Sequence, residues 1–407
     1  MARGRQREIP PCSKTYGFPI FCASWVPLDR ISTSAAASAE ATTEGDAPAE
    51  GEEKEGQGGR SATLAQTHDP NRILFALGGG GGDSRSGVPN VLLVAEFDLA
   101  SRSLSETPVC RLGTDMDAPY RMAVHPGGDG VVCSFTKSCR WFEWDIPEKK
   151  ESNKLNLKSS AKKLVQLEDV GQQLALAFNF DGSILATGAE DGHLRVFKWP
   201  SMENILDQSD AHTTVKDLDF SSNGKFLVSL GSSGPCRVWD LTSSTVIASL
   251  ARESGEHFGF CRFSRIMADN EVLYVTAMNG NQAKIISWHS LSWKRIGTKK
   301  VAREPISAFN VSMDGKHLAI GNLDGDVTIL RSSDLQAQLT VKKAHLGAVT
   351  ALAFSQDSRA LVSASFDSNA RVTVIERQKG SGFNAWVLLL VILLAILAYY
   401  LRLKEML

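Results

Sequence analysis

A segment of about 42 residues recurs along this chain, and no other feature constrains the fold as strongly. Three copies begin at Leu174, Val215 and Val349, and they read LALAFNFDGSILATGAEDGHLRVFKW, VKDLDFSSNGKFLVSLGSSGPCRVWDL and VTALAFSQDSRALVSASFDSNARVTVI. In each copy an alternating apolar segment is followed by a turn, an apolar segment, a second turn and a third such segment. This pattern predicts short antiparallel strands. The chain is therefore expected to fold as a series of similar small sheets.

Four less regular copies bring the total to seven. They start at Ile306, span 120–144 and 258–288, and divide between 16–28 and 73–97. A repeat of this length and strand content is typical of WD-type propeller blades. The sequence therefore predicts an all-β fold, a seven-bladed WD-type β-propeller over residues 16–378, preceded by an N-terminal tail of residues 1–15. A closed ring of blades leaves few strand edges exposed.

Two histidines follow an alanine at the start of a copy. His212 and His345 stand where repeats of this kind carry a Gly-His pair. We expect both to be structural hydrogen-bonding residues rather than catalytic ones. No convincing set of nucleophile, base and acid is present elsewhere in the sequence, so the chain is not expected to be an enzyme in the chemical sense.

Two polar segments interrupt the repeats. Residues 31–69 are rich in Ala, Ser, Thr, Gly and Glu, with seven acidic residues between Glu40 and Glu55 against one lysine. This composition cannot bury a core, and it predicts a disordered acidic insert within the first blade. Residues 147–163 carry six lysines and are expected to form a loop between the second and third blades. Such a loop is either simply solvated or contacts an acidic partner or lipid.

The segment 385–401 (AWVLLLVILLAILAYYL) contains 17 residues without a charge or a proline. As a helix it would be about 25 Å long, enough for a thin bilayer such as that of the endoplasmic reticulum. Trp386, Tyr399 and Tyr400 stand at its ends, as interfacial anchors do. We expect a single transmembrane helix. The alternative is a buried core helix, which the all-round apolar character disfavours.

The N-terminal sequence predicts on which side of the membrane the propeller lies. No uninterrupted apolar segment follows the basic N-terminus, so no secretion signal is expected ahead of the large domain. The propeller should then face the cytosol, and residues 402–407 should form a short lumenal tail. Seven scattered cysteines without C-x-x-C spacing suit a reducing compartment and support no zinc site. The net charge of −1 gives no electrostatic reason to expect nucleic acid binding.

A run of five glycines opens the loop GGGGGDSRSGVPN, residues 78–90, between two strands of the first blade. No Gly-Lys-Ser/Thr closes it and no GxGxxG can be placed on it, so nucleotide binding by this chain is disfavoured. Glycine lets a backbone approach another group closely or offer its carbonyls. The loop is therefore either a flexible spacer or a partner-contacting loop.

The glycine run followed by Gly-Val-Pro-Asn, in the first blade of a propeller with a C-terminal anchor, resembles the endoplasmic-reticulum guanine nucleotide exchange factors that start COPII coat assembly. The resemblance implies that this loop binds a potassium ion, contacts the coat's small GTPase and promotes GDP release. The potassium-loop candidates it implies are Gly78, Gly79, Gly80, Gly81 and Gly82. The GTPase-contact candidates are Gly87, Val88, Pro89 and Asn90, with Asn90 as the main side chain.

Within this family the chain is similar to the plant phosphate transporter traffic facilitators, in the glycine loop and in residues 119–143 (PYRMAVHPGGDGVVCSFTKSCRWFE). This similarity implies a role in delivering phosphate transporters to the plasma membrane. Three hypotheses follow: an exchange factor for the COPII GTPase, a non-catalytic export receptor or chaperone for phosphate transporters, and a propeller scaffold placed by its anchor.

Overall fold

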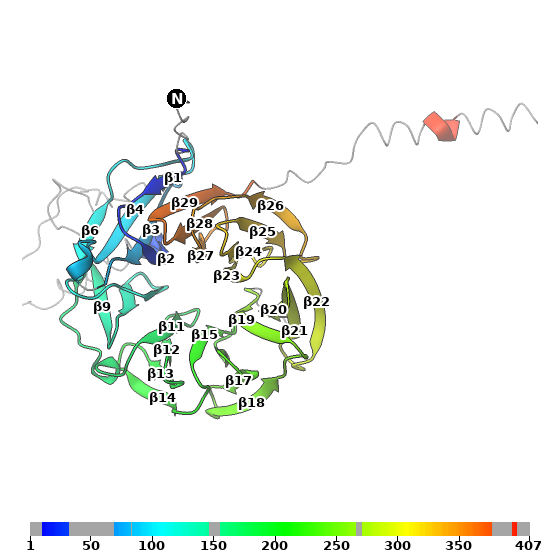
Figure 1. The fold of residues 1–407 in the computed structure, drawn as a ribbon, viewed down its shortest axis with the longest axis horizontal. Helices are drawn as coiled ribbons and strands as arrows, with labels where there is room; N and C mark the ends of the chain where they lie inside the picture. Colours follow the sequence, from blue (N-terminus) through cyan, green and yellow to red (C-terminus); the bar gives the residue numbers. More distant parts are fainter. Residues whose placement is uncertain are drawn as a thin grey trace, which may run out of the picture. The chain divides into compact units, whose positions relative to one another are not determined.

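Seven antiparallel sheets are arranged as a ring in the computed structural model (Figure 1). The structure describes residues 10–31, 69–82, 84–145, 155–265, 271–376 and 393–396. The sheets belong to one compact unit that ends at Val374. The prediction of an all-β, seven-bladed propeller is confirmed.

The first three blades follow the chain order. Blade 1 contains β2 (Ile20–Val26), β3 (Arg72–Gly79), β4 (Val91–Asp98), β5 (Ser103–Leu104) and β6 (Cys110–Gly113). Blade 2 contains β7 (Arg121–Val124), β8 (Gly130–Ser134), β9 (Cys139–Asp145) and β10 (Asn156–Ser159). Blade 3 contains β11 (Gln173–Phe178), β12 (Ile184–Ala189), β13 (Leu194–Lys198) and β14 (Glu203–Gln208).

The remaining blades are equally regular, and only the last takes a strand from elsewhere. Blade 4 contains β15 (Val215–Phe220), β16 (Phe226–Gly231), β17 (Cys236–Asp240) and β18 (Thr245–Leu250). Blade 5 contains β19 (Glu256–Phe263), β20 (Val272–Asn279), β21 (Gln282–His289) and β22 (Arg295–Ala302). Blade 6 contains β23 (Ile306–Val311), β24 (His317–Asn322), β25 (Val327–Arg331) and β26 (Ala337–Val341). Blade 7 contains β27 (Val349–Phe354), β28 (Ala360–Ser365), β29 (Asn369–Val374) and β1 (Ser13–Thr15).

Local sequence sets the turn between the first two strands of a blade. In blade 3, Asp181 Oδ1 accepts the backbone N–H of Ser183 at 2.9 Å, and Gly182 has a φ of +81°. In blade 7 the corresponding aspartate accepts a backbone N–H in the same way, at 3.0 Å, and Ser358 takes a φ of +59° in the glycine position. An acceptor side chain followed by a residue with positive φ is thus enough to specify the turn.

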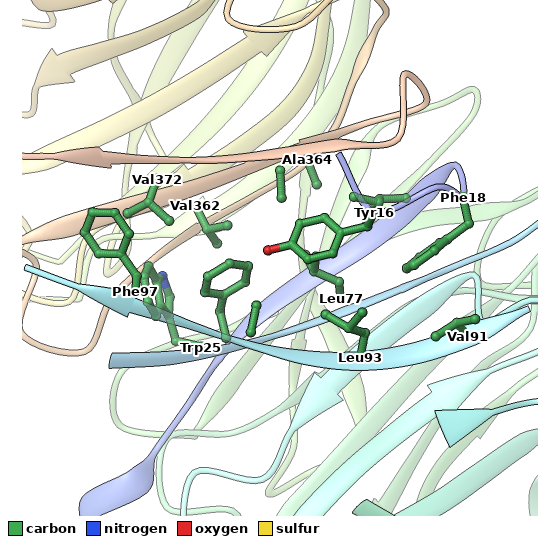
Figure 2. Close-up of a cluster of buried hydrophobic side chains, with 14 of the residues drawn as sticks. Tyr16, Phe18, Trp25, Leu77, Val91, Leu93, Phe97, Val362, Ala364 and Val372 are labelled. Atoms are coloured by element: carbon green, nitrogen blue, oxygen red, sulfur yellow. The ribbon is translucent and has the colours of Figure 1, made fainter. Parts of the chain in front are cut away.

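The N-terminus closes the ring. Residues 1–15 were expected to be a tail, but β1 pairs antiparallel with β29, joining Ser13 to Arg371 and Thr15 to Asn369. Behind this strand, Tyr16 and Trp25 pack with Val362 and Val372 in one apolar cluster shared by blades 1 and 7 (Figure 2). The tail prediction is wrong for residues 13–15 because their partner lies at the far end of the sequence, where no local pattern reveals it.

Two further boundaries differ from the sequence prediction. Ile31 was assigned to the acidic insert, but it closes a helical turn and is buried in the cluster of blades 1 and 2. Residues 32–68 of that insert, and 147–154 of the lysine-rich segment, lie outside the described residues. The second half of the lysine-rich segment is not only a loop, since β10 is the outer strand of blade 2. Leu155 and Leu157 are buried there, so the apolar residues between the lysines hold this strand.

The unit from Ile375 to Leu407 is described only in part. Residues 393–396 are helical and exposed. The rest of the predicted span 385–401, with Trp386, Tyr399, Tyr400 and the tail 402–407, lies outside the described residues. Among the described residues, no helix is long and apolar enough to cross a membrane.

Candidate functional site: the glycine loop and its surroundings

The first two glycines of the run belong to a strand. Gly78 pairs with Leu92 of β4 on one side and Cys22 of β2 on the other, and Gly79 pairs with Val91 and Ile20. A Cβ atom on Gly79 would lie 2.0 Å from the carbonyl oxygen of Pro19. Glycine is required at this position because another backbone packs against it.

The predicted loop therefore begins at Gly80 rather than at Gly78. Gly78 and Gly79 are strand residues, and coordination of an ion by them stays a prediction. The sequence placed them in the loop because a run of five glycines resembles a flexible segment throughout its length.

The loop itself folds back on the chain. Gly80 donates its N–H to Pro19 O at 3.0 Å and has a φ of +151°, while Gly82 and Gly87 have φ values of +73° and +69°. A Cβ atom on Gly80 would lie 2.3 Å from Asn90 Oδ1, and one on Gly81 would lie 2.1 Å from Ser86 Oγ. These glycines are needed for close contact within the loop and for left-handed backbone.

Asn90 is the residue around which the loop is arranged. Its Oδ1 accepts the N–H of Gly82 at 2.9 Å, and its Nδ2 donates to the carbonyls of Gly82 at 2.6 Å and Asp115 at 3.0 Å. The side chain is only 5% exposed. Asn90 thus fixes the glycine segment to the connection between blades 1 and 2. Its direct contact with a GTPase stays a prediction, and in this structure the side chain positions the loop from within.

The outer part of the loop offers a short backbone surface. Gly87 and Pro89 are exposed, and Val88 is half-buried against the cluster of blades 1 and 7. A 3-10 turn, η1 (Ser84–Ser86), precedes them, and Ser86 Oγ accepts the N–H of Val88 at 3.2 Å. Of the predicted contact residues, Gly87, Val88 and Pro89 are therefore available to a partner.

Exposed apolar side chains lie at the same end of the ring. In an antiparallel blade, the turn between the second and third strands and the connection to the next blade leave from one end. We call this end the loop face. It carries the glycine loop and several large apolar side chains that are more than half exposed, among them Met116, Leu323, Leu346 and Phe366.

Phe366 is held in place by aromatic contacts, and Met116 lies next to the glycine loop's anchoring point. Phe366 packs edge-on against Phe21, with ring centroids 5.7 Å apart, and Phe21 contacts Tyr120 at 6.4 Å. Met116 follows directly after Asp115, whose carbonyl is bonded to Asn90. Sequence reasoning missed this surface, although an apolar residue inside a polar turn, such as Phe366 before Asp367, is the signal that could have found it.

The two repeat histidines are structural, as predicted. His212 Nε2 and Trp239 Nε1 both form hydrogen bonds with Ser229 Oγ, each at 2.8 Å. Burial lowers the pKa of the His212 imidazole to about 4. His345 is buried, and its Nε2 forms a hydrogen bond with Ser363 Oγ at 2.8 Å. Both residues therefore link the start of a blade to its second strand.

Asp367 ties His345 to the loop face. Burial opposes ionisation of this carboxyl, but the nearby imidazole of His345, 3.6 Å away, and the hydrogen bond from the N–H of Leu346 hold its pKa well below the usual range. In the described ranges, no group of three or more His, Cys, Asp or Glu side chains is placed to hold a metal ion. Cys133 and Cys139 are buried thiols in neighbouring strands.

The repeats match a known family model. The model for the WD domain, G-beta repeat, matches residues 169–198, 204–240 and 336–373. Over 307 residues the chain is 54% identical to SEC12-like protein 2 of Arabidopsis thaliana, covering 75% of this chain and 77% of that protein. The chain belongs to the SEC12-like family.

Two further relatives show the breadth of the SEC12-like family. SEC12-like protein 1 of Arabidopsis thaliana is 33% identical over 74% of this chain and 75% of its own length. The mouse protein named guanine nucleotide-exchange factor SEC12 is 24% identical over 79% of this chain and 90% of its own. The family resemblance predicted from the glycine loop is confirmed.

Proposed function

We propose that this protein is a guanine nucleotide exchange factor at the endoplasmic reticulum, which promotes COPII-dependent export by stimulating GDP release from the coat's small GTPase. The observation that carries the proposal is the glycine loop fastened by Asn90 on the loop face of a SEC12-like chain. The mouse relative named as an exchange factor supports the activity.

A rigid loop suits this activity without any covalent chemistry. An exchange factor acts by binding the nucleotide-poor conformation of its GTPase more tightly than the nucleotide-bound one, and it shifts the equilibrium only by that difference. A loop that is already ordered loses little conformational entropy on binding. Gly87, Val88 and Pro89 would contact the GTPase, and the exposed apolar side chains of the loop face would extend that contact.

The proposal includes a potassium ion bound by the loop. Its ligands would be oxygen atoms. The carbonyls of Gly82 and Asp115 lie near each other because both accept a hydrogen bond from Asn90 Nδ2. Gly80, Gly81 and Gly82 would supply carbonyls and Asn90 an amide oxygen. Gly78 and Gly79 lie in the sheet next to these residues. A bound cation would supply positive charge that further stiffens the loop.

The C-terminal segment would place the propeller at the membrane. Residues 385–401 would form a single transmembrane helix, with the propeller in the cytosol and residues 402–407 in the lumen. An apolar, uncharged stretch of 17 residues supports this assignment.

The test is GDP release from the COPII GTPase, measured with purified full-length protein in detergent and a fluorescent GDP. We expect faster release with the wild type, and a slower effect when sodium replaces potassium. A variant in which an Asn-Gly turn replaces residues 80–90 should lose the effect. The matched control is Asn279→Ala, in the corresponding turn of blade 5, where Asn279 Nδ2 donates to Ser254 O at 3.3 Å. Equal release rates with and without the wild-type protein would exclude exchange activity.

A second candidate is a non-catalytic export receptor or chaperone for phosphate transporters. The higher identity to the plant SEC12-like protein than to the mouse exchange factor favours keeping it. It predicts that loss of the protein retains phosphate transporters in the endoplasmic reticulum while other secretory cargo moves normally. A general block in export, together with measurable exchange activity, would argue for the first candidate.

A further inference from the structure

The centre of the ring contains a cavity of about 230 Å³. Residues from the first strand of all seven blades line it. Most of these are small or apolar, but five are charged. The charged lining residues are Arg121, Lys216, Asp217, Asp219 and Arg262.

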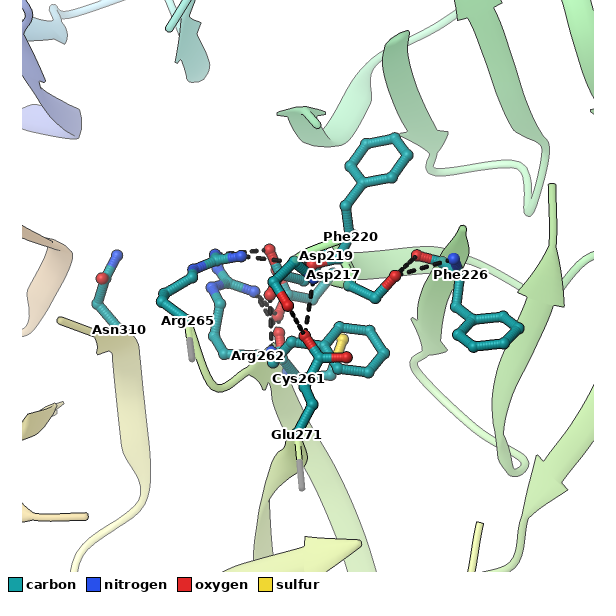
Figure 3. A network of polar contacts seen from close by, with 12 residues as sticks. Asp217, Asp219, Phe220, Phe226, Cys261, Arg262, Arg265, Glu271 and Asn310 are labelled. Atoms are coloured by element: carbon teal, nitrogen blue, oxygen red, sulfur yellow. Dashed lines mark hydrogen bonds and ion pairs between the residues drawn. The ribbon is translucent and has the colours of Figure 1, made fainter. Parts of the chain in front are cut away.

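Each of the two carboxylates is neutralised by an arginine of blade 5. Asp217 Oδ2 accepts the N–H of Cys261 at 2.8 Å and an N–H of Arg262 at 2.6 Å (Figure 3). Asp219 accepts the N–H of Phe263 at 2.7 Å and an N–H of Arg265 at 2.8 Å. Both aspartates are less than a tenth exposed. These ion pairs join blade 4 to blade 5 and leave little negative charge facing the cavity.

Two cations at the cavity are not balanced in this way. Arg121 donates Nε to Leu174 O at 3.0 Å and Nη1 to Phe21 O at 3.4 Å, and its guanidinium lies 4.6 Å from the Tyr120 ring. All three partners are uncharged. Lys216 lies on β15 and is exposed. Among the described residues, neither cation forms an ion pair with a carboxylate.

We propose that this cavity binds a small oxyanion of the phosphate or sulfate type, held by Arg121 and Lys216. The guanidinium is fixed by two carbonyls from neighbouring blades, so it is already oriented, and guanidinium and ammonium groups are the usual partners of such anions. The site is separate from the glycine loop, and it does not depend on exchange activity.

Calorimetric titration of the full-length protein in detergent with inorganic phosphate, sulfate and acetate tests the proposal. At constant ionic strength we expect saturable binding of phosphate or sulfate, weaker binding of acetate, and a loss of affinity as salt rises. Lys216→Met should weaken binding about tenfold by removing one of two cations. Arg121→Met should weaken it further, if that variant folds.

Lys300→Met is the matched control, since Lys300 is exposed on the outer strand of blade 5, away from the cavity lining. Its affinity for phosphate should equal that of the wild type. The absence of saturable binding at millimolar phosphate and sulfate would overturn the proposal. So would an affinity that is unchanged in Lys216→Met, a variant that loses no hydrogen bond of the described fold.

Discussion

Replacing Asn90 by alanine should disable the glycine loop while sparing the propeller. The change removes three hydrogen bonds, two to Gly82 and one to Asp115. At about 1 kcal/mol each, the loop loses about 3 kcal/mol, or about 2 kcal/mol once water satisfies the half-exposed Gly82 groups. If only the ordered loop binds the GTPase, a loss of 2 kcal/mol lowers stimulated GDP release by up to about 30-fold.

Two assays separate this effect from general damage. Hydrogen exchange should show fast exchange of the Gly82 amide in Asn90→Ala, because its acceptor is gone. The thermal unfolding midpoint should fall by no more than about 2–4 °C, as for a similar loss in a large domain. Asn279→Ala serves as the control in both assays and should behave like the wild type.

Asn90→Asp tests the role of the amide nitrogen separately. The aspartate keeps an acceptor for the N–H of Gly82 but turns an oxygen toward the carbonyls of Gly82 and Asp115, where the amide now donates. Without a cation, this substitution should be at least as harmful as alanine. Wild-type release rates and a protected Gly82 amide in Asn90→Ala would refute the view that Asn90 orders the loop. Full activity of Asn90→Asp in potassium alone would indicate instead that an oxygen at this place serves an ion.

Three further predictions concern the fold. Folding stability should decrease as the pH falls from about 6.5 toward 4. The unfolded chain then binds a proton at His212 that the folded chain does not bind, because folding lowers the pKa of this imidazole to about 4. His212→Gln should reduce this pH dependence in denaturant titrations at pH 7 and pH 5. Gly79→Ala should cost well over 2 kcal/mol of unfolding free energy, because its Cβ would meet Pro19 O. Gly82→Ala has open space around its Cβ and should cost only about 1–2 kcal/mol, from backbone strain. Equal unfolding midpoints of the two variants in urea would contradict this ranking. Deleting residues 1–15 should expose the edge of β29 and speed proteolysis of blade 7, and a cleavage rate equal to that of the full chain would count against β1 as a stabilising strand.

The blades could be predicted from the sequence because the patterns that specify their strands and turns are local. The Asp181-Gly182 turn and the alternating strands beside it lie within a few residues of each other, and the period repeats the same information along the chain. The strands β1 and β10 escaped prediction for different reasons. The partner of β1 lies at the other end of the chain, and the apolar residues of β10, Leu155 and Leu157, stand among lysines.

The sequence predicted the glycine loop but did not predict its internal structure. Composition distinguishes a glycine run from ordinary loops, yet it cannot tell that Gly79 faces a neighbouring backbone while Gly80 faces Asn90. The orientation of Asn90 depends on the carbonyl of Asp115, 25 residues away. The same limitation applies to the central cavity, whose charges come from different blades and become neighbours only in the closed ring.

Closure of the last blade by β1 has a consequence for the order in which the molecule can be made. Thr15 and Asn369 are partners separated by 354 positions, so the first strand to leave the ribosome waits for nearly the last. Bringing such distant ends together costs about 2 kcal/mol more in loop entropy than closing a loop the length of one blade. Six blades can form earlier, but the seventh is completed only when β29 has left the ribosome, and by then the apolar segment 385–401 is being synthesised. Closure of the propeller and synthesis of that segment therefore fall in the same brief interval of biosynthesis.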